Sequence, residues 1–241
     1  MAKSYKIATI QKFDLKIGSQ PVRVGAQYSL PEVPESPQTI IYKSRDIVKV
    51  EDFQALGIEH EHEVRMPGRV NDMRFERYIR KGFINCYKSE NKNLMLMSGK
   101  KDDILSFCRY TRNVPQIRIS TLRIDMKALL ARLAEVKLVW FRFPAGMIHA
   151  SALMGDHLEK TSAFKQAKSE AEISTLSFYF EDPNGRVHPL MVTGDGAVVV
   201  QDPYEQVATE VELVLSIKEQ LLDGIYLEEP IVFKAPTRNS P

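Results

Sequence analysis

Histidine and glutamate alternate in one short stretch, the pattern in this sequence that comes nearest to a metal site. Glu59-His60-Glu61-His62-Glu63 would place both imidazoles on one face of a strand and the three carboxylates on the other. Two histidines can share a metal ion, but a catalytic zinc site needs a third protein ligand. His149, His157 or His188 could supply it only if the fold brings one of them near. We therefore predict no metal and no cofactor, and interpret residues 57–71 as a mobile polar loop or an edge strand.

A second pattern imitates the two acids and one lysine of magnesium-dependent nucleases. Glu135 and Lys137 lead into an apolar strand, and Asp125 lies upstream. Such sites need carboxylates and a lysine that converge around a hard cation. A helix-like segment, residues 126–134, separates the aspartate from the glutamate. A metal-dependent nuclease is therefore an alternative interpretation, and we assign no catalytic residue.

Charge is distributed unevenly along the chain, although the total is close to zero. The 241 residues hold 33 Lys+Arg and 31 Asp+Glu, a net charge of +2. Residues 65–142 carry 18 basic and 7 acidic side chains, a net charge of +11, whereas residues 143–241 carry 7 and 15, a net charge of −8. Eleven of the 15 arginines lie in the basic segment, and arginine suits bidentate contact with phosphate. A basic surface of this kind favours binding to a nucleic-acid backbone.

We predict that the basic segment binds nucleic acid with little sequence specificity. Duplex DNA is favoured over RNA because the sequence shows no sheet signature of stacked aromatic residues. We interpret residues 74–81 as a short helix that presents part of this surface. The candidate contacts are Arg74, Arg77, Arg80, Lys81, Lys100, Lys101, Arg109 and Arg112.

The acidic segment offers a different interpretation. Complementary basic and acidic surfaces could dock within one chain, or between copies in a homo-oligomer. The protein would then act in protein–protein interaction or self-assembly. Both interpretations describe a protein that is not an enzyme.

Composition excludes several classes of protein. Apolar residues make up 44% and charged residues 27%, as is typical of globular proteins and unlike collagen-like or wholly disordered chains. Cys86 and Cys108 are too few for a disulfide framework. No apolar run approaches the length of about 18 residues that a membrane helix needs, and no signal peptide follows Met1. We predict a cytoplasmic protein with no membrane partner.

The elements that must position these residues fall into two predicted domains of an α+β protein. Residues 1–115 are predicted to form a β-rich domain that contains a Pro-rich loop, residues 29–38. Its predicted elements are strands over 6–17, 40–42 and 47–50, a hairpin of 82–87 with 94–97, and a helix over 102–111.

Residues 116–236 are predicted to form an antiparallel sheet covered by a few helices, followed by a tail, 237–241. The predicted elements are strands over 116–124, 136–143 and 147–154, helices over 126–134 and 160–172, and a meander of 173–181, 187–192 and 197–201. Asp125 is a predicted helix cap, and Asp182-Pro183-Asn184-Gly185 a hairpin turn. A long amphipathic helix, with Asp202 as its N-cap and residue 222 near its end, closes the domain.

The meander and its closing helix resemble the C-terminal part of phage-exclusion and phage-defence proteins. The resemblance covers ISTLSFYFEDPNGRVHPLMVTGDGAVVV and the helix that runs through IKEQLL. It consists of the order strand, turn, strand and helix. It implies a basic α+β body associated with DNA and a role in phage–host conflict, and it assigns no site residue.

Overall fold

The computed structural model describes most of the chain. The described residues are 2–18, 20–24, 38–44, 50, 52–64, 68–70, 73–76, 78–144, 149–202 and 204–227. The candidate Arg77 lies outside them, as do Pro203, the tail 237–241 and nearly all of the Pro-rich loop 29–38. Residues 47–49 of one predicted strand also lie outside.

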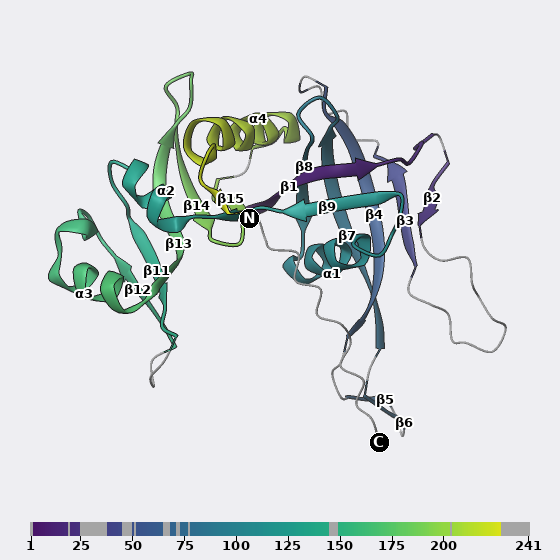
Figure 1. Ribbon diagram of the computed structural model, residues 1–241, viewed down its shortest axis with the longest axis horizontal. Helices are drawn as coiled ribbons and strands as arrows, with labels where there is room; N and C mark the ends of the chain where they lie inside the picture. The colour runs from purple at the N-terminus through teal and green to yellow at the C-terminus, as the bar shows by residue number, and fades with distance from the viewer. Residues whose placement is uncertain are drawn as a thin grey trace.

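The fold is α+β, as predicted, and its main element is a 12-stranded antiparallel sheet (Figure 1). The strand order is β12-β11-β13-β14-β15-β1-β8-β7-β4-β3-β2, and β9 pairs with β1. The bounds along this order are Ala150–Met154, Leu138–Arg142, Glu172–Glu181, Val187–Thr193, Ala197–Val200, Lys3–Phe13, Leu94–Gly99, Tyr78–Ser89, Gln54–Val64, Thr39–Lys43 and Val22–Val24, with β9 at Ile117–Thr121. Two small sheets pair β10 (Arg123–Ile124) with β16 (Tyr226–Leu227), and β5 (Gly68–Val70) with β6 (Met73–Phe75).

Among the described residues, four α-helices flank the sheet. They are α1 (Lys101–Thr111), α2 (Met126–Arg132), α3 (Ser162–Glu170) and α4 (Val207–Ile217), and a π-helical turn, Lys218–Leu222, continues α4. We call β11 to β15 the C-terminal half of the sheet and its remaining strands the N-terminal half. In Figure 1, α1 lies against β7 to β9 of the N-terminal half, whereas α2 and α3 lie with β11 to β14.

Two hydrophobic cores lie on opposite faces of this sheet. Along β1, Tyr5 and Ile7 belong to the core that α2, α3 and α4 cover, and Ala8 belongs to the core that α1 covers. On β8, Leu96 and Met97 divide between the two cores in the same way. Because successive side chains of a strand point to opposite faces, β1 and β8 contribute to both cores. The predicted domain boundary at residue 115 stays a prediction.

Local signals in the sequence account for several element ends. The Asp125 carboxylate accepts hydrogen bonds from the backbone N–H groups of Lys127 and Ala128, at 3.0 and 3.1 Å, and so caps α2 as predicted. The β13–β14 hairpin turns at residues 182–186, where the Asp182 side chain accepts from the backbone of Asn184 and Arg186.

Three predicted elements are wrong. The described residues of 74–81 form no helix; residues 74 and 75 lie in β6 and residues 78–81 in β7, which pairs with β4 from Tyr78 to Lys88. Residues 57–64 are not a free loop or an edge, since β4 lies between β3 and β7, whereas residues 68–70 form β5 of a two-stranded sheet and residues 65–67 and 71 lie outside the described residues. Asp202 does not cap the last helix, which begins at Val207. The backbone N–H of Gln201 still donates to the carbonyl of Pro189 on β14, so the chain at this point continues the sheet.

Among the described residues, no helix is both long enough and apolar enough to cross a membrane.

Candidate nucleic-acid interface

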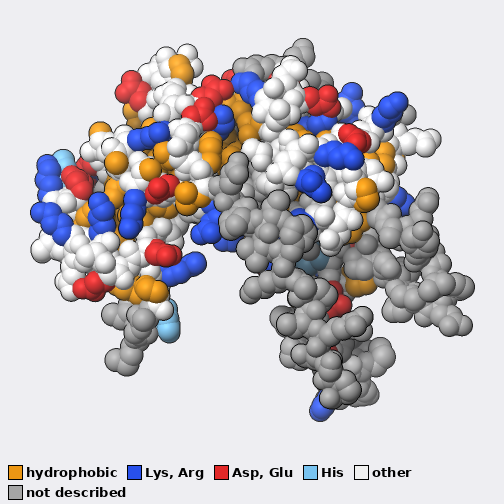
Figure 2. Space-filling model, viewed as in Figure 1, with side chains coloured by type: hydrophobic (Ala, Val, Ile, Leu, Met, Phe, Trp, Pro, Cys, Tyr) orange, Lys and Arg blue, Asp and Glu red, His pale blue; other side chains and the backbone are white. Residues whose placement is uncertain are grey.

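The predicted basic contacts are spread over three places in the fold. Arg74 lies on β6, Arg80 and Lys81 lie on β7, and the other described candidates lie on α1 or directly beside it. Arg74, Lys100, Arg109 and Arg112 are exposed. Figure 2 shows Lys and Arg side chains over both halves of the visible face, with Asp and Glu side chains among them. Basic side chains on this face are therefore interspersed with acidic ones.

Neighbouring carboxylates compensate three of the predicted cations. Arg80 lies 2.9 Å from the buried carboxylate of Asp103, and Lys81 forms an ion pair with Glu59 on the adjacent strand. Lys101 lies 2.8 Å from Asp195. The pairs of Arg80 and Lys81 weaken the case for a phosphate site on β7. The Lys101–Asp195 pair lies at the wall of a pocket.

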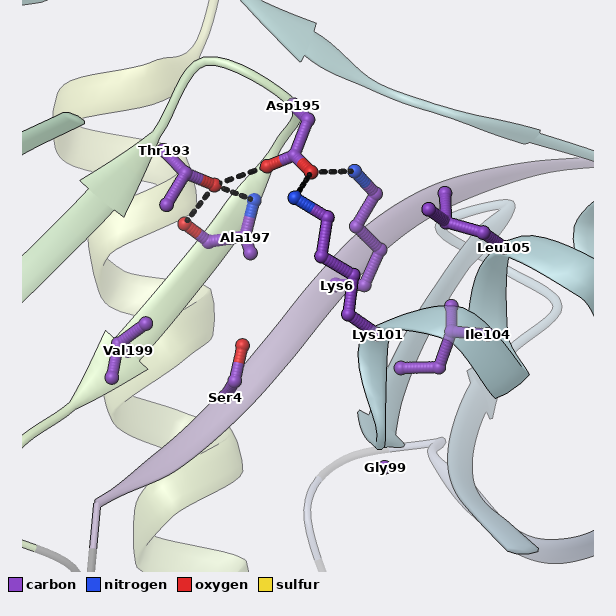
Figure 3. Close-up of a pocket in the computed structure, with 10 residues that line it drawn as sticks. All are labelled: Ser4, Lys6, Gly99, Lys101, Ile104, Leu105, Thr193, Asp195, Ala197 and Val199. Carbon is purple, nitrogen blue, oxygen red and sulfur yellow. Dashed lines mark hydrogen bonds and ion pairs between the residues drawn. The ribbon is translucent and has the colours of Figure 1, made fainter. Parts of the chain in front are cut away.

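This pocket lies where β1, β15 and the start of α1 meet (Figure 3). Its volume is about 150 Å³, and much of its wall is apolar side chains of α1 and β15. The polar wall consists of Ser4, Lys6, Lys101, Thr193 and Asp195. We call it the junction pocket.

Asp195 holds two ammonium groups at the junction pocket. Lys101 Nζ lies 2.8 Å and Lys6 Nζ 3.7 Å from its Oδ2, and the Thr193 hydroxyl donates to its Oδ1. Burial alone would raise the pKa of Asp195, but the hydrogen bonds from Lys101 and Thr193 and the charge of Lys6 outweigh burial and lower that pKa to about 2. The side chain of Lys6 is only 7% exposed, so Asp195 provides the counter-charge for a buried cation.

The turn that carries Asp195 depends on Gly196. Its φ of +83° suits glycine, and a Cβ there would lie 2.0 Å from the carbonyl oxygen of Leu122. The close approach of the β14–β15 turn to the segment between β9 and β10 thus fixes the aspartate beside Lys6 and Lys101.

An open groove of about 510 Å³ continues from the junction pocket and shares Lys101, Thr193 and Asp195 with it. We call it the junction groove. Three exposed cations line it from three different elements: Arg123 of β10, Lys127 of α2 and Arg142 of β11. Within the part of the chain that the structure describes, none of these three forms an ion pair.

Cations outnumber carboxylates along the pocket and groove together. The cations are Lys6, Lys101, Arg123, Lys127 and Arg142, and the carboxylates are Asp125, Glu172 and Asp195. Asp125 is engaged with the backbone of α2, and Asp195 with Lys6 and Lys101. Glu172 lies opposite Arg142 in the pairing of β11 with β13, and with this carboxylate counted the lining still carries more cations than carboxylates and can accept an anion.

Of the charged residues that line the junction pocket and groove, only Lys101 is among the contacts predicted from the sequence. Arg123, Lys127 and Arg142 belong to the basic segment, so the charge count contained a signal for them. Lys6 and Asp195 carry no such signal, because only the pairing of β1 with β15, through Lys6 and Ala197, brings them together.

The alternating histidines occupy a different place, under α1. His60 is 2% exposed; its Nδ1 lies 2.8 Å from the Thr39 hydroxyl and its Nε2 3.0 Å from the Ser106 hydroxyl. Burial, with a smaller effect of His62, lowers the pKa of His60 to about 4. No group of three or more metal-ligating side chains occurs among the described residues.

The nuclease-like residues are only partly brought together. Lys137 Nζ lies 2.9 Å from Glu135 and 2.6 Å from Asp156, so the second acid beside it is Asp156 and not Asp125. These hydrogen bonds, first from Asp156 and then from Glu135, raise the pKa of Lys137.

A scan against protein-family models and a search of curated proteins found no match for this chain. The resemblance to phage-exclusion and phage-defence proteins thus stays a prediction.

Proposed function

We propose that this protein binds nucleic acid and that the junction groove holds the phosphate backbone. One observation carries the proposal: Arg123, Lys127 and Arg142 converge on one groove from three elements without an ion-pair partner among the described residues. Cations that neutralise backbone phosphates release the counterions condensed on the nucleic acid, which makes binding favourable and salt-dependent. We place this binding in the cytoplasm, and a role in phage–host conflict rests on the resemblance alone.

The predicted cations at the start of α1 fit this proposal better than those on β7. Lys101 lines the groove and the exposed Lys100 precedes it, whereas Arg109 and Arg112 lie at the other end of α1, about 12 and 16 Å along the helix axis at about 1.5 Å per residue. Exposed cations near a binding groove attract a polyanion over about 8–10 Å at physiological salt. Arg80 and Lys81 are already paired with carboxylates, and so contribute little.

The test is a charge reversal in the groove. We expect Arg123→Glu/Lys127→Glu/Arg142→Glu to weaken binding to a labelled oligonucleotide at least about tenfold and to reduce the salt slope by roughly two, because each lost phosphate contact removes about 0.7–0.9 from that slope. Fluorescence anisotropy at several salt concentrations measures both quantities.

A matched control carries the same change of charge elsewhere. Lys160, Lys165 and Lys168 are exposed in or beside α3 and do not line the groove. We expect their triple replacement by Glu to alter affinity only a few-fold. Equal losses in both triple variants would mean that net charge, and not the groove, governs binding. Undiminished binding by the groove variant would contradict the proposal.

The alternative interpretation, in which the basic and acidic segments pair with each other, is supported by ion pairs within the chain. Lys92–Glu219, Lys101–Asp195 and Lys137–Asp156 each join the basic segment to the acidic segment. Sedimentation at low and high salt separates the two functions. A salt-sensitive oligomer that binds no oligonucleotide would favour assembly.

A further inference from the structure

Among the described residues, no helix covers one face of the C-terminal half of the sheet. Its other face packs Val139, Phe141 and Phe178 against the core that α2, α3 and α4 cover. On the face without a helix, Trp140 is 43% exposed, and Tyr179, over whose ring Lys137 Nζ lies 5.8 Å from the centroid, is 58% exposed. Uncovered aromatic rings of this size on a sheet indicate a contact surface.

Strand register makes this face continuous with the junction pocket. Met154 pairs with Leu138, Leu138 with Ser177, Ser177 with Met191, Met191 with Val199, and Val199 with Ser4. Val199 and Ser4 line the pocket. One row of side chains therefore runs from the edge strand β12 to the pocket wall.

The same face meets the junction groove at Arg142. Trp140 and Arg142 lie two residues apart on β11 and so point to the same side, about 7 Å apart along the strand. Arg142 and Thr175, the partner of Trp140 on β13, both line the groove. A phosphate held by Arg142 would thus place the attached base near the indole ring.

We propose that this face is a stacking platform for single-stranded nucleic acid, with bases on Trp140 and Tyr179 and phosphates along the junction groove. The inference rests on the proposed function and names its ligand. Aromatic rings beside a basic groove are the arrangement by which proteins hold unpaired bases. The sequence favours duplex DNA because it shows no signature of stacked aromatic residues on a sheet, whereas the fold places the exposed rings of Trp140 and Tyr179 on one sheet face.

The spacing of the two rings suits a short stretch of single-stranded nucleic acid. Trp140 is paired with Thr175, and Tyr179 lies four residues further along β13. At about 3.3 Å per residue and about 4.8 Å between strands, the rings are roughly 14 Å apart. At about 3.4 Å per stacked nucleotide, a strand of about four nucleotides spans them.

Trp140 is the only tryptophan of the chain, so its fluorescence reports on this face alone. We expect an oligothymidylate of about 12 nucleotides, a length within the usual site sizes, to quench the emission of Trp140. A duplex of the same length at the same salt should quench it much less. Equal quenching by both, or none by the single strand, would overturn the platform.

Substitutions test the platform independently of quenching. Trp140→Ala and Tyr179→Ala should each weaken binding of the labelled oligothymidylate roughly five- to a hundredfold, the range for loss of one stacked base. Trp140→Phe keeps a ring and should restore most of the affinity. The control is Phe83→Ala, which removes an aromatic ring that is 61% exposed on β7, outside the platform and groove.

The remaining outcomes separate the two proposals. If the groove variant loses binding while Trp140→Ala and Tyr179→Ala bind normally, the platform is wrong and the proposed function stands. If the wild-type protein binds neither strand form at low salt, the proposed function itself fails. If the free protein sediments as a dimer that Trp140→Ala converts to monomers, a second copy covers this face and the platform is overturned.

Discussion

In the N-terminal half of the sheet, α1 covers the face that carries Ala8, Cys86 and Met97, whereas in the C-terminal half α2, α3 and α4 cover the opposite face. The strands β1 and β8 serve both cores. Covering elements therefore change sides near the junction, and α1 begins there beside the β14–β15 turn. This exchange leaves the junction groove and the face of Trp140 open.

The charges of the two regions differ as well. On β4 and β7 of the N-terminal half, strand pairing sets cations close to carboxylates, as for Lys81 and Glu59. In the junction groove, Arg123, Lys127 and Arg142 form no ion pair among the described residues, although Glu172 lies opposite Arg142 in the pairing of β11 with β13. A charge count along the chain cannot distinguish these situations, since it does not register which cations are paired.

The largest expected effect tests whether the two halves unfold together. Phe107, on α1, and Phe178, on β13, are at most 2% exposed, each in a different core. We expect Phe107→Ala and Phe178→Ala each to reduce the free energy of unfolding by about 3–5 kcal/mol. Because β1 and β8 belong to both cores, both variants should lower the temperature of one shared transition in calorimetry.

The coupling would be contradicted if calorimetry showed two unfolding transitions and each variant shifted only one of them. They would make the halves independent domains and would support the predicted boundary at residue 115. An exposed position on α3, such as Lys165→Ala, is the control and should leave the transition nearly unchanged.

A smaller effect is expected for the core that α1 covers, where the free energy of unfolding should depend on pH through His60. His60 is buried in the neutral form, and burial lowers its pKa from 6.5 to about 4. The unfolded chain therefore takes up a proton at a higher pH than the folded one, and folding loses stability as pH falls from about 6.5 to 4. The loss amounts to about 3 kcal/mol at about 1.36 kcal/mol per pKa unit.

Urea unfolding between about pH 7 and pH 4 measures this loss. His60→Gln, whose amide can still bond to Thr39 and Ser106, should lack that part of the decline. His157→Gln removes an exposed histidine of the C-terminal half and should behave as the wild type. Parallel declines in the wild type and His60→Gln would show that another group titrates.

Much of the fold could be predicted because local signals agree with tertiary structure. The Asp125 cap, the hairpin at Asp182 and the helix near residues 102–111 each depend on neighbours within a few residues. Residues 74–81 show the limit: their arginines have helical spacing, but the long pairing of β7 with β4 outweighs that preference.

The candidate site was less accessible to sequence reasoning. Lys101 could be named from the basic segment, but its partner Asp195 lies in the acidic segment and reaches it only through the order β8-β1-β15. Likewise, nothing local to Trp140 indicates that the face of β11 on which it lies has no covering helix.

The smallest effect concerns Asp195, where the two halves meet. Its pKa is lowered from 3.8 to about 2, so the folded protein binds a proton less readily than the unfolded chain, and the stabilisation is lost as pH falls from about 4 to 2. The carboxylate is 37% exposed, and solvent screening reduces the contribution to about 1 kcal/mol. Asp195→Asn should lack this loss in urea unfolding below about pH 4, whereas Asp202→Asn, at an exposed aspartate outside the pocket and groove, should retain it. If the Asp195→Asn variant and the wild-type protein lost stability equally, the Lys6–Asp195–Lys101 contact would not hold the two halves together, and the groove would owe its shape to backbone pairing alone.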